Sequence, residues 1–250
     1  MKERPPPVFG IPELDAVLGP ALPAGWLGLL TGSPGSGTHL LAKQAAHAAA
    51  GSGPVLYYAT HESAAEVTRV FESFGWDPLP ITIADLGREL HQEQLDRDIA
   101  VGRARARGLA LAEAALGAPA VPSGAYPPSL AGRLLTDVAP RDAPFRLVLD
   151  SLDLLLERGS AEETTRVARQ IRHQALAVGG GALLVLHPAV TEPRTVALLE
   201  VIADFVLHLD LVEDGTQFYP SFLLRKVRNH PECARRFRGS VTGRGMEAQF

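Results

Sequence analysis

The stretch from Trp26 to Leu41, WLGLLTGSPGSGTHLL, joins three kinds of local pattern. Its apolar part, Trp26–Gly32, predicts a short buried strand, and the glycines and proline that follow predict a turn. From Thr38 the chain reads THLLAKQAAHAAAG, which favours a helix that stops at Gly51. A strand, a glycine turn and a helix in direct succession indicate an α/β protein.

The same alternation continues through most of the chain. Residues 54–60 have the composition of a second buried strand, and residues 63–74 predict a helix that closes at Gly75. Further strands are predicted at 81–86, 145–150, 182–187, 205–211, 222–227 and 236–241, and further helices at 90–116, 129–138 and 161–178, with a Pro/Gly-rich loop at 117–128. This order predicts a mostly parallel sheet with helices on its faces.

Composition limits the function classes. The 250 residues suffice for one large domain or two small ones. The net charge of −4 gives no general positive field for nucleic acid. The single cysteine, Cys233, excludes an intrachain disulfide and a zinc ribbon, and no apolar stretch approaches the ~18 residues that would span a bilayer. We therefore expect a cytoplasmic protein without membrane segments.

Polar residues follow four of the predicted strands. Ligands of open α/β sheets gather at the carboxyl ends of the strands. These ends carry Gly32–Gly37, Thr60-His61-Glu62, Asp150-Ser151 and His187. The sequence therefore predicts a ligand site at this edge of the sheet.

The glycines of this turn match the pattern of a P-loop, G-x-x-x-x-G-K-[ST]. In a P-loop the backbone amides and the lysine hold phosphates, and the hydroxyl binds Mg²⁺. Thr38 stands where the lysine belongs, and His39 stands where the Ser/Thr belongs. The candidate nucleotide-binding residues are Gly32, Ser33, Pro34, Gly35, Ser36, Gly37, Thr38 and His39. The alternative is a glycine turn that never bound phosphate.

Several motifs together resemble the KaiC-like branch of the RecA superfamily of P-loop ATPases. The matching segments are Phe9–Asp15 (FGIPELD), Leu22–Gly25 (LPAG), Gly32–Gly37, Tyr57–Glu62, Ser73–Asp77 (SFGWD), Leu147–Leu152 (LVLDSL), Arg225–His230 (RKVRNH) and Gly245–Glu247. The resemblance covers nearly the whole chain, and residues 85–144 match least.

The resemblance implies a single RecA-like domain over residues 1–250, with antiparallel strands near the C-terminus, and ATP bound between subunits of a ring or filament. By the same resemblance, Asp150 is the Walker B carboxylate that holds Mg²⁺ through water. Glu62 is the candidate that polarises the attacking water, and Lys226 and Arg228 contact the phosphates of a neighbouring subunit. His61 replaces the first of the family's two glutamates.

Each of these residues also has a structural interpretation. Asp150 is alternatively an acid that caps the next turn, and Glu62 one that favours the positive end of a helix dipole. Lys226 and Arg228 share one face of a strand, which suits a joint anion contact or the protection of an edge strand.

Two groups of polar residues lie outside these assignments. The histidines His39, His61 and His187 permit a metal or anion site, but each is alternatively a hydrogen-bonded polar residue. The arginines at 103, 105 and 107 favour a solvated helix face or a subunit contact over DNA.

The preferred interpretation is an oligomeric regulatory or structural pseudo-ATPase that binds ATP weakly or not at all. The implied cofactor is ATP or ADP with Mg²⁺, or none, and the implied partner is a second copy of the chain or an active paralogue. One alternative is a working ATPase that recruits Lys43, Lys226 or a neighbour's Arg228 to replace the lost charge. Another is a recombinase-like protein that binds single-stranded DNA, which the net charge does not favour.

Overall fold

The computed structural model describes residues 6–106 and 130–249. In this part of the chain nine strands form one sheet in the order β3-β2-β4-β5-β1-β6-β7-β8-β9. In this spatial order, neighbouring strands from β3 through β2, β4, β5 and β1 to β6 are parallel. Neighbouring strands from β6 to β9 are antiparallel. The strands are β1 (Trp26–Gly32), β2 (Val55–Ala59), β3 (Ile81–Asp85), β4 (Arg146–Asp150), β5 (Gly181–Leu186), β6 (Phe205–Asp214), β7 (Gln217–Val227), β8 (Arg235–Thr242) and β9 (Gly245–Gln249). The predicted α/β class, with a mostly parallel sheet and antiparallel C-terminal strands, is confirmed.

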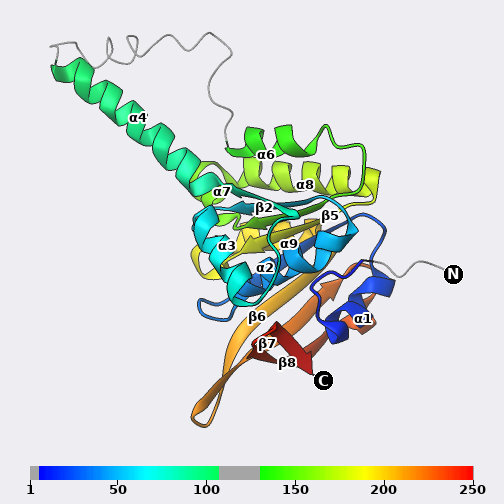
Figure 1. The fold of residues 1–250 in the computed structure, drawn as a ribbon. Helices are drawn as coiled ribbons and strands as arrows, with labels where there is room; N and C mark the ends of the chain where they lie inside the picture. Colours follow the sequence, from blue (N-terminus) through cyan, green and yellow to red (C-terminus); the bar gives the residue numbers. More distant parts are fainter. Residues whose placement is uncertain (1–5, 107–129, 250) are drawn as a thin grey trace.

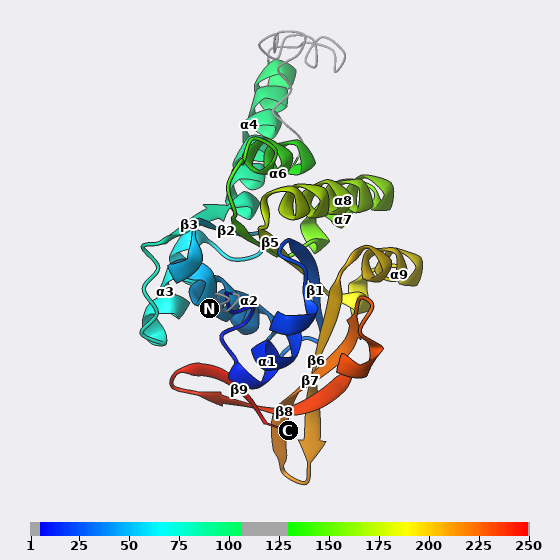
Figure 2. The same cartoon turned by 90° about the vertical axis from the view of Figure 1, so that its right-hand side faces the viewer.

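Helices cover both faces of the parallel part of the sheet (Figure 2). One face carries α1 (Pro12–Ala21), α2 (Thr38–Ala49) and α3 (Ala64–Ser73), and the other carries α6 (Leu130–Val138), α7 (Asp153–Arg158), α8 (Ala161–Val178) and α9 (Pro193–Ile202). Helix α4 (Leu86–Ala106) projects away from the body, as does the far end of the β6–β7 hairpin (Figure 1). Short 3-10 turns lie at Ala50–Ser52, Pro188–Val190 and Pro231–Cys233.

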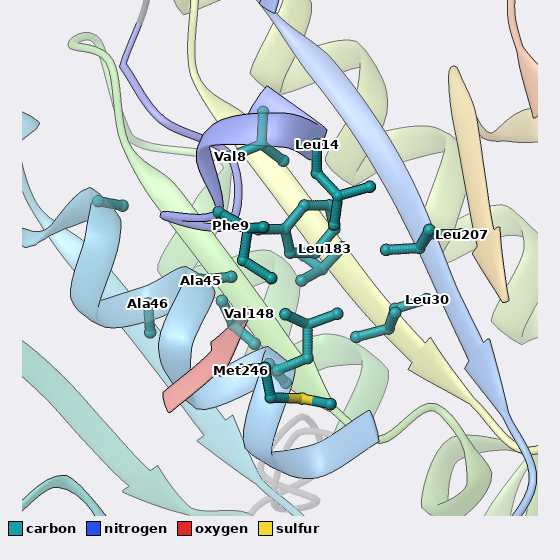
Figure 3. Close-up of a cluster of buried hydrophobic side chains, with 14 of the residues drawn as sticks. Val8, Phe9, Leu14, Leu30, Ala45, Ala46, Val148, Leu183, Leu207 and Met246 are labelled. Atoms are coloured by element: carbon teal, nitrogen blue, oxygen red, sulfur yellow. The ribbon is translucent and has the colours of Figure 1, made fainter. Parts of the chain in front are cut away.

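The central strands are buried on both faces, which explains their nearly continuous apolar sequences. Successive residues alternate between two cores, so that Tyr57 packs on the α2 side of β2 and Tyr58 on the α8 side. Figure 3 shows Val148, Leu183 and Leu30 of three strands facing α2 and the N-terminal segment. The two cores hold the carboxyl ends of the parallel strands in a common plane.

Helix ends follow the signals in the sequence. Helix α3 begins with a capping box in which Ser63 and Glu66 satisfy each other's backbone amides. Helix α8 begins after Ser160, whose hydroxyl accepts from the Glu163 amide, and ends at Gly179 with a φ of 71°. These caps explain why the predicted boundaries of both helices agree with the structure to within one residue.

Within residues 6–106 and 130–249 the structure contains three helices that the sequence patterns did not predict: α1, α7 and α9. Helix α1 lies in a Pro- and Gly-rich region and carries a proline in its first turn, where proline is tolerated. Helix α4 begins at Leu86, four residues before the predicted start, because the Asp85 carboxylate accepts a hydrogen bond from the Arg88 amide at 2.8 Å. The predicted loop at 117–128, the end of the predicted helix and Arg107 lie outside the described residues.

No helix in residues 6–106 and 130–249 is long and apolar enough to cross a membrane.

Candidate functional site

A glycine turn connects β1 to α2. Gly35 and Gly37 adopt positive φ angles of 82° and 89°, which residues with a Cβ rarely adopt. A Cβ on Gly32 would lie 2.1 Å from Thr38 Oγ1, so the turn closes tightly over the first residue of α2. The sequence-predicted turn is therefore present, and it needs glycine at these positions.

Neutral hydroxyl groups line the inside of this turn. Ser36 Oγ donates to the Ser33 carbonyl at 2.7 Å and lies 2.8 Å from Thr38 Oγ1. Ser36 and Thr38 are both almost completely buried. The turn is thus stabilised by its own hydroxyls, and the side chain at position 38 brings no positive charge to it.

A carboxylate lies beside the turn. Because Gly32 of β1 pairs in parallel with Leu209 of β6, the next residue, Asp210, lies next to Ser33. Ser33 Oγ donates to Asp210 Oδ1 at 2.8 Å. This hydrogen bond holds the pKa of Asp210 below its usual value. Asp210 is therefore ionised at neutral pH and places a negative charge at the glycine turn.

Asp150 at the end of β4 is buried and held by two side chains. Its Oδ1 lies 2.6 Å from His39 Nδ1, and its Oδ2 accepts from the Tyr57 hydroxyl. Burial, with the neighbouring Asp150 charge, raises the pKa of Tyr57 well above its usual value, so the phenol remains a donor. Both oxygens of the sequence-predicted Walker B carboxylate are thus engaged within the chain.

Lys43 of α2 supplies the positive charge of the site. Its side chain is 2% exposed, and its Nζ forms an ion pair with Glu62 Oε2 and lies 3.8 Å from Asp150 Oδ2. Glu62 follows β2 and Asp150 ends β4, and these two strands are neighbours in the sheet. A single buried ammonium group therefore lies between the two sequence-predicted catalytic carboxylates.

The three histidines of the expected edge do not form one group. His39 and His187 have ring centroids 5.0 Å apart, and His187 Nδ1 lies 2.5 Å from Asp153 Oδ2. His61 is exposed. Among the described residues no group of three or more His, Cys, Asp or Glu side chains could hold a metal ion. The hydrogen-bonded interpretation fits His39 and His187.

The His39–Asp150 contact predicts a pH effect on stability. Its hydrogen bond raises the pKa of His39 above 6.5, more than burial lowers it. Its contribution is therefore fully present below about pH 6.5 and is lost as pH rises through the folded-state pKa. Urea unfolding at pH 6 and pH 9 should show that wild type loses more stability than His39→Gln over this range. Equal losses in the two proteins would contradict the assignment.

The glycine turn lies at the carboxyl ends of the parallel strands. Lys226 and Arg228 of the same chain lie at the opposite ends, near the start of β6, because β7 runs antiparallel to β6. Lys226 Nζ donates to the carbonyls of Glu200, Val201 and Ala203 at the end of α9. Arg228 also donates to carbonyls there, and its Nε donates to Asp204 Oδ1 at 2.8 Å. Within this chain both residues bind the end of the same helix, and their contact with a neighbour's phosphates stays a prediction.

Sequence patterns missed Tyr57 and Asp210 as members of this site. Tyr57 belongs to an apolar strand, where a tyrosine is an ordinary core residue. Asp210 lies 177 residues after Ser33 in the sequence. It is adjacent to the glycine turn only because β1 pairs with β6. The sequence contains no local signal for that pairing.

A family model described as the KaiC ATPase matches residues 8–248. The fold is similar to the crystal structure of a KaiC-like protein from the hyperthermophilic archaeon Pyrococcus horikoshii OT3, with a TM-score of 0.63, 20% identity and 97% of each chain covered. No curated protein matches the chain.

Proposed function

Because this chain belongs to the KaiC family of RecA-like P-loop ATPases, we propose that it is a pseudo-ATPase with a regulatory or structural role, one that binds ATP weakly or not at all. The observation that carries the proposal is the buried Lys43 ammonium group between Glu62 and Asp150. Within the proposal, residues 1–250 act as one RecA-like domain in the cytoplasm.

The charge at the glycine turn supports weak nucleotide binding. A P-loop normally offers a lysine to the β- and γ-phosphates. Here position 38 is a neutral threonine, and Asp210 lies at the turn as a carboxylate. A polyphosphate entering this turn would lack the attraction of a lysine and would be repelled by the Asp210 carboxylate.

The contacts of Asp150 support poor binding of Mg²⁺. This hard cation prefers oxygen ligands and keeps several of its waters. Position 39 offers an imidazole in place of a hydroxyl, and that imidazole lies on Asp150 Oδ1 while the Tyr57 hydroxyl donates to Oδ2. The residues present therefore do not fit a Mg²⁺ ion bound in the manner of the family.

The pairing of Glu62 supports the loss of hydrolysis. A carboxylate that polarises water must offer an oxygen to that water. Glu62 Oε2 instead accepts from the buried Lys43 ammonium group. The alternative in which Lys43 assists a working ATPase would require it to leave both of its carboxylate partners.

The direct test is ATP turnover with Mg²⁺. We expect the purified protein to release ADP no faster than the buffer background, and calorimetry to detect no binding of ATP at micromolar concentration. Turnover by the wild-type protein that is lost in Asp150→Asn would overturn the proposal, because that result requires a working Walker B carboxylate.

A double variant provides the matched gain of function. Thr38→Lys with His39→Thr restores the P-loop consensus, and we expect it to bind ATP at least about tenfold more tightly, because charge-assisted contacts to phosphate are among the strongest. Hydrolysis should stay at background, since Glu62 remains paired with Lys43. No gain in affinity would contradict the charge argument.

Assembly with a second copy of the chain, or with an active paralogue, belongs to the same proposal. Lys226 and Arg228 would reach a neighbour's phosphates only after leaving the carbonyls at the end of α9. Their present contacts support a structural role in this chain. Light scattering of the purified protein, alone and with nucleotide, tests whether it forms an assembly and whether nucleotide alters it.

A further inference from the structure

A cavity lies at the amino ends of the parallel strands, opposite to the glycine turn. It has a volume of about 350 Å³. Its walls include Trp26, Arg146 and Gly181, the first residues of β1, β4 and β5. Arg146 and Asp150 stand at the two ends of β4, so the two sites are separated by about 13 Å at ~3.3 Å per residue. The cavity is therefore distinct from the nucleotide region.

Arg146 is buried in the wall of this cavity with an unsatisfied donor. The residue is 8% exposed, and its guanidinium lies 4.4 Å from the centroid of the Trp26 ring. Nη2 donates to the Pro7 carbonyl at 3.3 Å, whereas Nη1 is buried and has no hydrogen-bond partner in the described chain. Burial lowers the pKa of Arg146 to about 10, so it is charged at neutral pH. A buried cationic donor without a partner is unfavourable unless something binds it.

Asp15 does not supply that partner. Its carboxylate attracts Arg146 electrostatically, but Oδ1 accepts from the amides of Val8 and Phe9 and Oδ2 from that of Gly10. Arg146 forms no ion pair with a carboxylate of residues 6–106 or 130–249. Asp15 therefore reduces the net positive charge near the cavity without occupying Nη1.

The rest of the wall is shaped for an apolar body. Trp26, Phe145, Pro54 and Pro144 are among the residues that line it. A Cβ on Gly181 would lie 2.7 Å from the Trp26 ring, so glycine is needed there for the indole to keep its place beside Arg146. A concave apolar site of a few hundred Å³ with one convergent polar group is typical of small-molecule sites.

We propose that this cavity binds a small organic anion whose single carboxylate pairs with the guanidinium group of Arg146 and whose apolar body packs against the wall that includes Trp26 and Phe145. One guanidinium group, with a carboxylate nearby, suits a monoanion better than a polyphosphate. The aromatic and proline walls favour an organic ligand over an inorganic one.

The test uses phenylacetate as the probe and the fluorescence of Trp26 as the signal. The chain has two tryptophans, and Trp76→Phe leaves Trp26 as the only one. In this background phenylacetate should change the emission of Trp26 with a saturable dependence. The neutral probe phenylacetamide, and phenylacetate added to the further variant Arg146→Met, should each bind at least about tenfold more weakly.

Folding of the variants is checked by thermal unfolding. Arg146→Met removes a buried charge that has no ion-pair partner among the described residues, so we expect its midpoint to equal or exceed that of its background. In the wild-type chain phenylacetate should raise the midpoint and phenylacetamide should not, which tests the site without any substitution.

Four outcomes would overturn the proposal. They are no saturable response to phenylacetate at millimolar concentration, equal binding of phenylacetamide, unchanged binding in Arg146→Met, and equal or tighter binding of inorganic phosphate. The last outcome would assign an inorganic anion to Arg146. None of these measurements involves ATP, so their result is independent of the proposed pseudo-ATPase.

Discussion

Replacement of Lys43 with methionine should lower the free energy of unfolding by about 3 kcal/mol, which is typical when one partner of a buried ion pair is removed. The substitution keeps the length of the side chain and leaves Glu62 and the buried Asp150 without their ammonium group. The estimate is at the lower end for such pairs because Glu62 is 35% exposed and part of its charge is hydrated. Urea denaturation followed by circular dichroism measures the change.

Two further variants separate charge from packing. Lys226→Met removes an ammonium group that binds only carbonyls at the end of α9, and we expect a cost of about 1 kcal/mol. The triple variant Lys43→Met, Glu62→Gln, Asp150→Asn removes all three charges, and it should recover part of the stability lost by Lys43→Met alone. Equal stability of wild type and Lys43→Met would refute the interpretation of Lys43 as the internal cation of the site.

Asp204→Ala should destabilise the protein by about 3–5 kcal/mol. Asp204 is 1% exposed, and it accepts from the guanidinium groups of Arg172 and Arg228 and from the Leu27 amide. All three donors lose their acceptor in the variant. The control is Asp214→Ala, because Asp214 forms an exposed 3.5 Å ion pair with Arg238 and should change stability by less than about 0.5 kcal/mol.

The same variant should flatten the acid limb of the stability curve. Burial alone would raise the pKa of Asp204, but hydrogen bonds from Arg172 and Leu27, together with the charges of Arg172 and Arg228, hold this pKa below its usual value. A group with a depressed folded-state pKa stabilises the protein above its unfolded pKa, about 3.9, and this contribution is lost as pH falls through the folded value. Urea midpoints between pH 7 and pH 3 should therefore fall less steeply in Asp204→Ala. Parallel curves would show that Asp204 does not control this range.

Local patterns predicted eight of the nine described strands, all but β9, and the helix at 161–178. The strand at 26–32 and the helix at 161–178 have the predicted ends, because apolar runs and caps act over a few residues. Helix α9, which begins at Pro193, has no comparable signal at its start, since Glu192 forms no side-chain cap. The sheet edge was likewise predicted, since the carboxyl ends of parallel strands must meet there.

The contacts within the site were not predictable from local patterns. From sequence spacing Lys43 was a candidate for reaching back toward the glycine turn, but its ammonium group contacts Glu62 and Asp150 instead. That choice depends on the packing of α2 against the sheet and on the adjacency of β2 and β4. The period of a strand places Lys226 and Arg228 on one face, whereas their carbonyl partners at the end of α9 depend on how that helix packs.

The position of Lys43 between two carboxylates has a consequence for how the sequence can vary. Restoring the P-loop pattern changes residues 38 and 39, and freeing Glu62 from its ion pair requires a further change at Lys43, so the order of the steps matters. A path that removes Lys43 first passes through a destabilised protein, whereas one that restores positions 38 and 39 first keeps an ammonium group on the carboxylate that would act on water. Under the proposed loss of hydrolysis, no single substitution restores the activity, because positions 38 and 39 and the pairing of Glu62 with Lys43 would all have to change.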